Sequence, residues 1–176
     1  SMMNTSFFEC TYGSYVRMYY QKIFDAIIAT PVSLEEVIAG ELLWGSTKSM
    51  IHATIMLVII VAFGLAQHPI VLLVIPFSFL AGFLFSTIAM CFTALTYNID
   101  SLNYPIYLFI TPMFLFSGTF FPVSILPVQI QFLSRVFLPL LHVVAITRSL
   151  TLGQIDLMIV TSMAWILVVS FILYIV

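Results

Sequence analysis

Four long apolar stretches constrain the fold of this chain more than any other feature of its sequence. They cover residues 34–66, 70–97, 104–121 and 155–176. A helix needs about 20 mostly apolar residues to cross a bilayer, because in hydrocarbon every backbone N–H and C=O must be satisfied within the segment. We therefore predict an all-α integral membrane protein, a polytopic bundle with four complete spanning helices.

The composition excludes an ordinary soluble domain. Hydrophobic residues make up 62% of the chain and charged residues 7%, whereas a soluble domain carries about 25% charged residues. The five Lys and Arg residues are spread along the sequence, so no basic patch could follow a phosphate backbone. Nucleic acid is therefore not an expected partner, whereas membrane lipid is.

The first 20 residues carry an aromatic stripe. Phe8, Tyr12, Tyr15 and Tyr19 recur at i, i+4, i+7 and i+11, a spacing that places them on one face of an α-helix. We interpret residues 1–20 as the end of a fifth spanning helix. The sequence leaves two roles open for the stripe, an aromatic belt or helix-packing face or the lining of a substrate path.

Residues 21–33 predict a short amphipathic turn that is followed by the start of a long helix. Pro31 disfavours helical geometry at the residue before it and so ends the turn. Ser33 and Glu36 have the S-x-x-E spacing of a capping box, in which each side chain satisfies a backbone amide of the first helical turn. We therefore expect a helix to begin at residue 34 and to continue into the first full span.

Residues 122–153 lie between the third and fourth apolar stretches and are too apolar for a free loop. Pro122, Pro127 and Pro139 divide them, and apolar residues follow helical spacing around position 136. We expect short helices that lie in the membrane interface or dip back into the membrane.

The sequence contains no familiar catalytic or nucleotide-binding motif. It has no G-x-x-x-x-G-K-[ST] phosphate loop, no H-E-x-x-H zinc helix and no G-x-S-x-G nucleophile elbow. Cys10 and Cys91 stand too far apart for a paired metal-ligand motif. We therefore expect no catalytic residue and no metal site. An integral-membrane enzyme acting on lipid or glycan and a non-transporting scaffold stay open as alternatives to a transport subunit.

Several short motifs occur in an order that resembles a known family. They are FFE at 7–9, YGSYVR at 12–17, ATPVS at 29–33, IAGE at 38–41, SGTFFP at 117–122 and LP at 126–127, with Pro112, Pro139, Arg148 and Gly153. Together they resemble the membrane subunit of ABC-2 type exporters, most closely the permeases that export nodulation factors, which are lipo-oligosaccharides. By this resemblance the chain is a fragment that lacks span one and most of span two.

The resemblance implies a function and a set of partners. Permeases of this family have six spans per subunit, pair as dimers, and dock a cytoplasmic ABC ATPase through a short coupling helix between spans two and three. The chain would then be a transport subunit of a bacterial inner membrane and not an enzyme, paired with a second copy or a second permease subunit. It would bind no cofactor itself, since ATP and Mg²⁺ belong to the ATPase.

The resemblance also assigns residues to sites. Residues 1–20 match the end of span two, 21–33 the coupling segment, and 122–153 an extracytoplasmic re-entrant region. We expect an exposed apolar face on the coupling segment, formed by the side chains at 24, 27 and 28, to dock the ATPase. The expected ATPase contacts are Lys22, Phe24, Asp25, Ala26, Ile27, Ala29, Thr30, Pro31 and Glu35. The expected substrate path is lined by Phe8, Tyr12, Tyr15, Tyr19, Tyr107, Thr111, Phe114 and Gly118.

The charge distribution and the resemblance together predict an orientation. Arg17, Lys22 and Lys48 lie on one side of the four spans and Arg135 and Arg148 on the other, so the positive-inside rule favours a cytoplasmic location for the first group. In a background without native cysteines, we expect a cysteine at position 135 to react with an impermeant thiol reagent in intact cells and one at position 48 to be protected. The reverse labelling pattern would show that the orientation is wrong.

Overall fold

The structure, a computed structural model, describes residues 2–64, 69–96, 98–117, 138–152 and 157–175. All secondary structure in these ranges is helical, which confirms the predicted all-α class. Labels with η mark short π-helical or 3-10 segments. In chain order the elements are α1 (Met2–Phe8), η1 (Glu9–Gly13), η2 (Val16–Tyr20), α2 (Ile23–Ile28), α3 (Leu34–Ala62), η3 (Pro69–Leu73), α4 (Val74–Leu95), η4 (Ile99–Leu102), α5 (Asn103–Pro105), η5 (Ile106–Ile110), α6 (Thr111–Phe116), α8 (Pro139–Leu152) and α9 (Leu157–Ile175).

In the described ranges, two helical stretches are long and apolar enough to cross a membrane. They are α3 and the run Pro69–Leu95, in which η3 leads into α4. The apolar part of α9, Ile159–Tyr174, is shorter. A count of four complete spans and part of a fifth therefore stays a prediction.

The third apolar stretch, predicted as one helix over 104–121, divides into α5, η5 and α6. Pro105 and Pro112 have no N–H to donate, so regular α-helical hydrogen bonding is interrupted, and the π-helical segment η5 lies between these two prolines. Residues 118–121, including Gly118, lie outside the described residues. Of the predicted re-entrant region 122–153, α8 is described from Pro139 on and residues 122–137 and 153 lie outside the described ranges.

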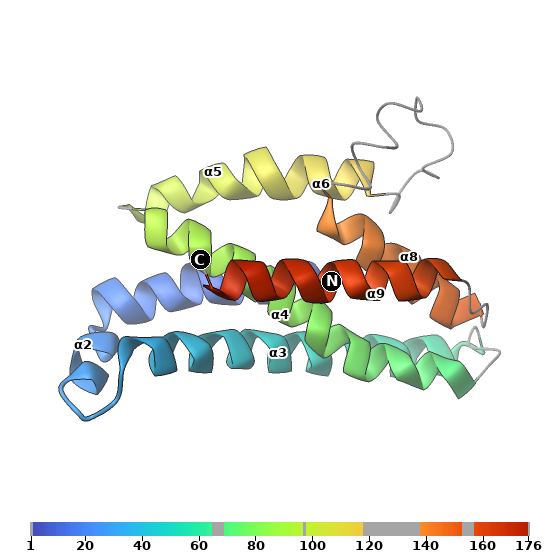
Figure 1. Cartoon of the computed structure of the whole chain (residues 1–176), viewed down its shortest axis with the longest axis horizontal. Helices are drawn as coiled ribbons and strands as arrows, with labels where there is room; N and C mark the ends of the chain where they lie inside the picture. Colours follow the sequence, from blue (N-terminus) through green and yellow to red (C-terminus); the bar gives the residue numbers. More distant parts are fainter. Residues whose placement is uncertain (1, 65–68, 97, 118–137, 153–156, 176) are drawn as a thin grey trace.

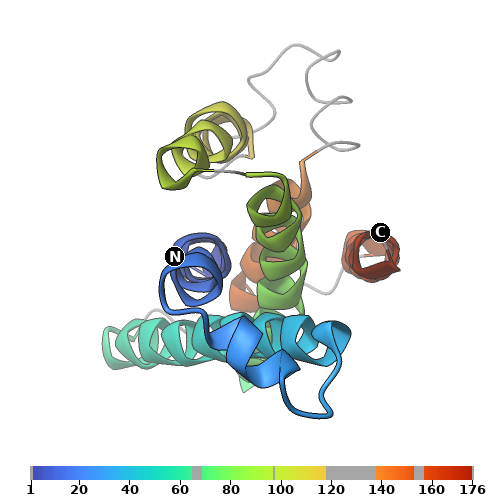
Figure 2. The ribbon, with the colours of Figure 1, turned by 90° about the vertical axis from the view of Figure 1, so that its left-hand side faces the viewer.

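Helix α4 is the centre of the bundle. Figure 2 shows it in green between the N-terminal helix on one side and α9 on the other, with α3 crossing beside it. It contacts α1, α3, α8 and α9. A helix that is apolar on all sides lies in a protein core or spans a membrane. Its buried apolar side chains are Val74, Phe77, Ala81, Leu84, Phe85, Ile88 and Ala89.

Small residues at every fourth position allow three helices to approach closely. In hydrocarbon no hydrophobic force drives helices together, so close backbone approach, van der Waals contact and hydrogen bonds must hold them. A Cβ added to Gly82 would lie 2.7 Å from Ser49 Cβ and 3.1 Å from Ser46 Cα, which shows how close α3 and α4 are. The buried small residues at this spacing are Ser6, Cys10 and Ser14 in the N-terminal helix, Gly45, Ser49 and Ala53 in α3, and Ser78, Gly82 and Ser86 in α4.

Buried hydroxyl groups join the same three helices by donating to backbone carbonyls. Ser6 Oγ donates to Gly45 O at 3.3 Å, which joins α1 to α3. Ser49 Oγ donates to Ser78 O at 3.3 Å, which joins α3 to α4. Thr93 Oγ1 at the end of α4 donates to a carbonyl of η1 at 3.1 Å. Each pair of helices is therefore linked at a fixed register.

Two π-helical segments, η1 and η2, interrupt the N-terminal helix. A π-helix closes its hydrogen bonds over five residues, as in the bond from Gln21 N–H to Val16 O at 2.9 Å. The aromatic residues consequently form two pairs and not one continuous face. The side chain of Tyr15 is 4% exposed, whereas that of Phe8 is 43% exposed.

The predicted start of α3 is confirmed. Ser33 Oγ accepts from Glu36 N–H at 3.4 Å, and Ser33 N–H donates to Glu36 Oε2 at 2.9 Å, which completes the capping box. The helix then runs unbroken for 29 residues. It ends just before Gly64, whose φ of 69° lies in the left-handed region that glycine adopts without strain.

Replacing Gly82 by Ala should destabilise the bundle, because the new methyl group would push α3 away from α4. Overpacking of this kind costs about 1–3 kcal/mol, which thermal unfolding in detergent would detect as a lower melting temperature. Gly40→Ala is the matched control, since a Cβ at that position of α3 meets no atom within 4 Å. Equal melting temperatures for the two variants would contradict the close crossing.

Candidate functional site

The predicted coupling segment forms the short helix α2 at one end of the bundle (Figure 1). Lys22 has a φ of 49°, in the left-handed region, where the chain turns between η2 and α2. Helix α2 contacts both η2 and α3, so it lies between the two helices that it connects. Most of the predicted ATPase contacts are exposed: Lys22, Asp25, Ala26, Ala29, Thr30, Pro31 and Glu35.

Phe24 does not belong to an exposed docking face, and that part of the prediction is wrong. Its side chain is 3% exposed, and Ile27 is half-buried. A helix of six residues is not stable alone, so its apolar side must pack against the rest of the chain. Phe24 therefore anchors α2, and the surface left for a partner is more polar than we expected. The side chain at position 28 lies outside the described part of the structure.

The two segments that carry the predicted substrate path are joined by a hydrogen bond. Tyr12 Oη donates to Asn103 Oδ1 at 2.7 Å, which joins η1 to α5. Tyr107 and Thr111 are exposed, whereas Phe114 is half-buried against the apolar core. The role of these residues in a path stays a prediction.

Sequence reasoning missed an ionic network between the N-terminal helix and α3. Arg17 is its centre: Nη1 lies 3.3 Å from Glu9 Oε1, and Nη2 pairs with Glu41 Oε2. Ser14 Oγ donates to the same oxygen of Glu41 at 2.8 Å. Gly13 leaves room for this arrangement, since a Cβ there would lie 3.3 Å from Arg17 Nη2. The side chains of Arg17 and Glu41 are 25% and 13% exposed, so salt in the solvent screens their attraction less than it would for a fully exposed pair.

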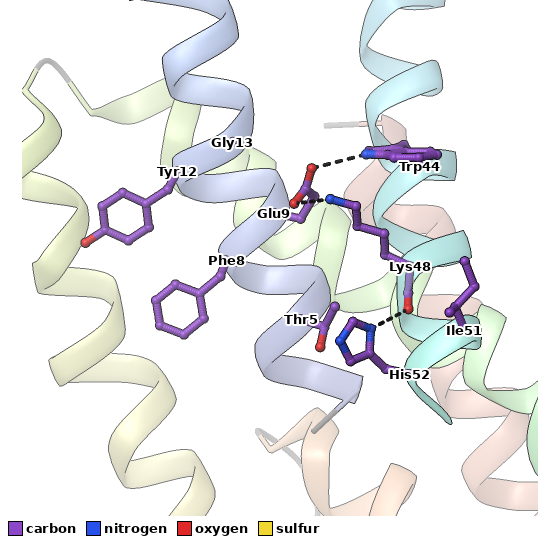
Figure 3. A pocket seen from close by; sticks show the side chains of 9 residues that line it. All are labelled: Thr5, Phe8, Glu9, Tyr12, Gly13, Trp44, Lys48, Ile51 and His52. Carbon is purple, nitrogen blue, oxygen red and sulfur yellow. Dashed lines mark hydrogen bonds and ion pairs between the residues drawn. The ribbon is translucent and has the colours of Figure 1, made fainter. Parts of the chain in front are cut away.

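Glu9 extends the network along α3, as Figure 3 shows. Its carboxylate pairs with Lys48 Nζ at 2.8 Å and accepts from Trp44 Nε1 at 3.1 Å. Lys48 Nζ also lies 5.2 Å from the centre of the Trp44 ring, within the range of a cation–π interaction. Two carboxylates and two cations make the network neutral. Such balance suits a site beside hydrocarbon, where an unpaired charge is costly.

The sequence does contain a signal for this network. Glu41, Trp44 and Lys48 recur at i, i+3 and i+7, so they share one face of α3. Glu9 and Arg17 are opposite charges eight residues apart in an otherwise apolar segment. Opposite charges on the faces of two apolar helices predict an ion-paired contact.

An open hollow of about 620 Å³ lies beside the network, and we call it the aromatic groove. In Figure 3, Phe8 and Tyr12 extend from the N-terminal helix away from α3, whereas Glu9 extends toward Trp44 and Lys48 of α3. The Phe8 and Tyr12 rings are stacked, with centres 5.9 Å apart. The lining residues are Thr5, Phe8, Glu9, Tyr12, Gly13, Trp44, Lys48, Ile51 and His52.

A second hollow, of about 370 Å³, is almost entirely apolar. Next to it His142 stacks on Trp165, with ring centres 4.6 Å apart, and His142 Nδ1 lies 3.1 Å from Ser162 Oγ. Within the described ranges, no three or more His, Cys, Asp and Glu side chains gather as a metal site requires. The hollow is lined by Ile88, Cys91, Phe92, Phe109, Pro139, Trp165, Val169 and Leu173.

Comparison with known proteins identifies similar chains. The family model described as ABC-2 type transporter matches residues 1–152. Nodulation protein J of Sinorhizobium fredii and that of Rhizobium meliloti are each 35% identical over 154 residues, and that of Rhizobium leguminosarum bv. trifolii is 33% identical over 154 residues. Each alignment covers 88% of this chain, which spans 58% of the length of each relative. No solved structure matches the chain.

Replacing Arg17 by Gln should destabilise the contact between the N-terminal helix and α3, because Glu9 and Glu41 would then lose their shared cation. Loss of a partly buried charged hydrogen-bond partner costs about 1–3 kcal/mol, measurable as a lower melting temperature in detergent. The double variant Arg17→Gln/Glu41→Gln should recover part of the loss, since one of the unpaired carboxylates is removed.

Asp100→Asn serves as the control for the loss of a charge, because Asp100 is exposed. If Arg17→Gln melted at the same temperature as this control, the ionic network would have no structural role.

Proposed function

Because the chain belongs to the ABC-2 type transporter family, we propose that it is a membrane-spanning permease subunit of an exporter powered by ATP. The observation that carries this proposal is the family match over residues 1–152. The substrate would be amphipathic, a lipo-oligosaccharide, polysaccharide, lipid or drug, and would move out of the cytoplasm. The relatives are proteins of Sinorhizobium fredii and Rhizobium meliloti that are named for nodulation, and a bacterial inner membrane is the proposed location.

The proposed energy source is a separate cytoplasmic ABC ATPase that binds ATP and Mg²⁺. Helix α2 supports this division of labour, because it presents an exposed surface between two long helical segments. Its neighbour α3 begins at the capping box and continues without interruption for 29 residues, about 43 Å at a rise of 1.5 Å per residue. A displacement of α2 would therefore be carried along a rigid helix.

The proposed path for the substrate runs beside the N-terminal helix and the third apolar stretch, in a complex with a second copy or a second permease subunit. Exposed aromatic side chains on both elements support it, because rings accommodate both the apolar and the polar parts of an amphiphile. Phe8, Tyr19 and Tyr107 are exposed in this chain, and Tyr12 joins the two elements. Tyr15, which is buried, would support the wall of the path and not line it.

Replacing Ala26 by Glu should abolish transport and weaken copurification with the ATPase. Ala26 is exposed on α2, so a larger charged side chain would disturb the docking surface while the spanning helices stay intact. Expression and membrane insertion should therefore stay near those of the unchanged protein. The measurements are export of substrate and the amount of ATPase retained on the affinity-purified complex.

Gln21→Glu is the matched control, because it adds the same charge at an exposed position just before α2 and outside the proposed contact set. Retained export and ATPase binding in Ala26→Glu would place the coupling surface elsewhere.

A further inference from the structure

We propose that the ion pair between Arg17 and Glu41 couples ATP hydrolysis to export, an inference that rests on the proposed function and adds a positioning residue, Arg17, to it. The pair was not among the sites expected from the sequence. Arg17 lies in η2, before the segment that contains α2, and Glu41 lies in α3, after that segment. The pair therefore joins the two helical segments on either side of the proposed docking surface.

The contacts of the pair hold it in one arrangement. Arg17 Nη2 pairs with Glu41 Oε2, and Ser14 Oγ donates to the same oxygen at 2.8 Å. Arg17 Nη1 lies 3.3 Å from Glu9 Oε1, on its own helix. An arginine bound to two carboxylates cannot turn away without breaking charge-assisted hydrogen bonds, which are stronger than neutral ones. The separation of the N-terminal helix and α3 is consequently fixed at this point.

Partial burial makes the pair a firmer link than a surface salt bridge. An exposed ion pair contributes little, because water replaces each partner when the pair opens. The side chains of Arg17 and Glu41 are at most a quarter exposed. Opening this pair would leave charges that water reaches poorly, and removing one partner of such a pair is strongly destabilising. A force on one of the two helices is therefore passed to the other.

The position of the pair relative to α2 gives it a role in coupling. Helix α2 contacts both η2 and α3, and its buried side chain Phe24 anchors it. A displacement of α2 thus reaches both neighbours. If η2 and α3 were free to separate, the turns that flank α2 would absorb part of the displacement, as hinges do. With the pair intact, the two helices move together and the displacement is delivered to the rest of the bundle.

The complete complex of full-length permease and ATPase, reconstituted in proteoliposomes, would test the inference. ATP hydrolysis and transport of a lipo-oligosaccharide with a fluorescent acyl chain are measured in the same vesicles. In the double variant Arg17→Met/Glu41→Met no unpaired charge remains at this position, and methionine cannot form the ion pair. We expect ATPase copurification and ATP hydrolysis to be retained. The amount transported per ATP hydrolysed should fall about tenfold, as for the loss of one charged hydrogen-bonded link.

Lys48→Met is the matched control for a loss of stability. It removes a second ion pair between the same two helices, Glu9 to Lys48 at 2.8 Å, which lies farther along α3 from α2 than Glu41 does. The variant should melt at a lower temperature in detergent, and the amount transported per ATP should stay near that of the unchanged complex. An equal fall in both variants would overturn the inference, since the effect would then follow stability and not coupling.

If the double variant does not fold, Glu41→Gln tests the same link, because Arg17 then keeps its pair with Glu9 and only a weaker neutral acceptor faces it from α3. An unchanged amount transported per ATP in the variant that folds would overturn the inference, as would loss of ATPase copurification, which would assign the pair to docking.

Either of these failures leaves export by the unchanged complex intact and the permease proposal standing. If instead the unchanged protein neither retained an ATPase nor exported, the permease proposal would fail and this inference with it.

Discussion

The close crossing of the N-terminal helix, α3 and α4 is the contact on which the rest of the structure depends. In a bilayer the lipid tails are as apolar as leucine, so burying apolar side chains gives no driving force for association. These helices are held by close approach and by hydroxyl-to-carbonyl hydrogen bonds. The crossing tolerates no extra atom: a Cβ on Gly45 would lie 2.4 Å from Ser86 Oγ and 2.6 Å from Cys10 Sγ. Larger apolar residues on α4 then fill the space toward α8 and α9, where helices approach through side chains and not backbones.

The same crossing sets the register of the ionic network. Cys10 lies against Gly45, and the residues next to these two, Glu9 and Trp44, are hydrogen-bonded across the same crossing. One turn farther along α3 the same carboxylate meets Lys48. A slip of one residue would separate these partners and leave partly buried charges unpaired. Packing of small residues and pairing of charges consequently specify the same alignment.

The sequence predicted the elements of this fold better than their contacts. The capping box at Ser33 and the long helix after it follow from local chemistry, which explains why that prediction is confirmed.

The prediction of an exposed docking face was wrong at Phe24. A side chain on a short amphipathic helix can pack onto its own chain as well as onto a partner, and spacing does not distinguish these cases. Likewise, i+4 and i+7 spacing assumes an α-helix, and the π-helical segments η1 and η2 altered which aromatic residues share a face. The charges of the ionic network are visible in the sequence, but which charge pairs with which depends on the helical faces that meet.

These contacts also constrain how a push on α2 could reach the proposed path. The two ends of the segment between η2 and α3 are held together, because Arg17, before the segment, pairs with Glu41, after it. The two helices that flank α2 are therefore tied together close to the point where an ATPase would act, and α2 cannot move by spreading them apart. On the proposed coupling role, a displacement of α2 moves the N-terminal helix and α3 as one unit against the other helices of the bundle. The residues that line the aromatic groove all belong to that unit, so the groove would move with the two helices and keep its shape.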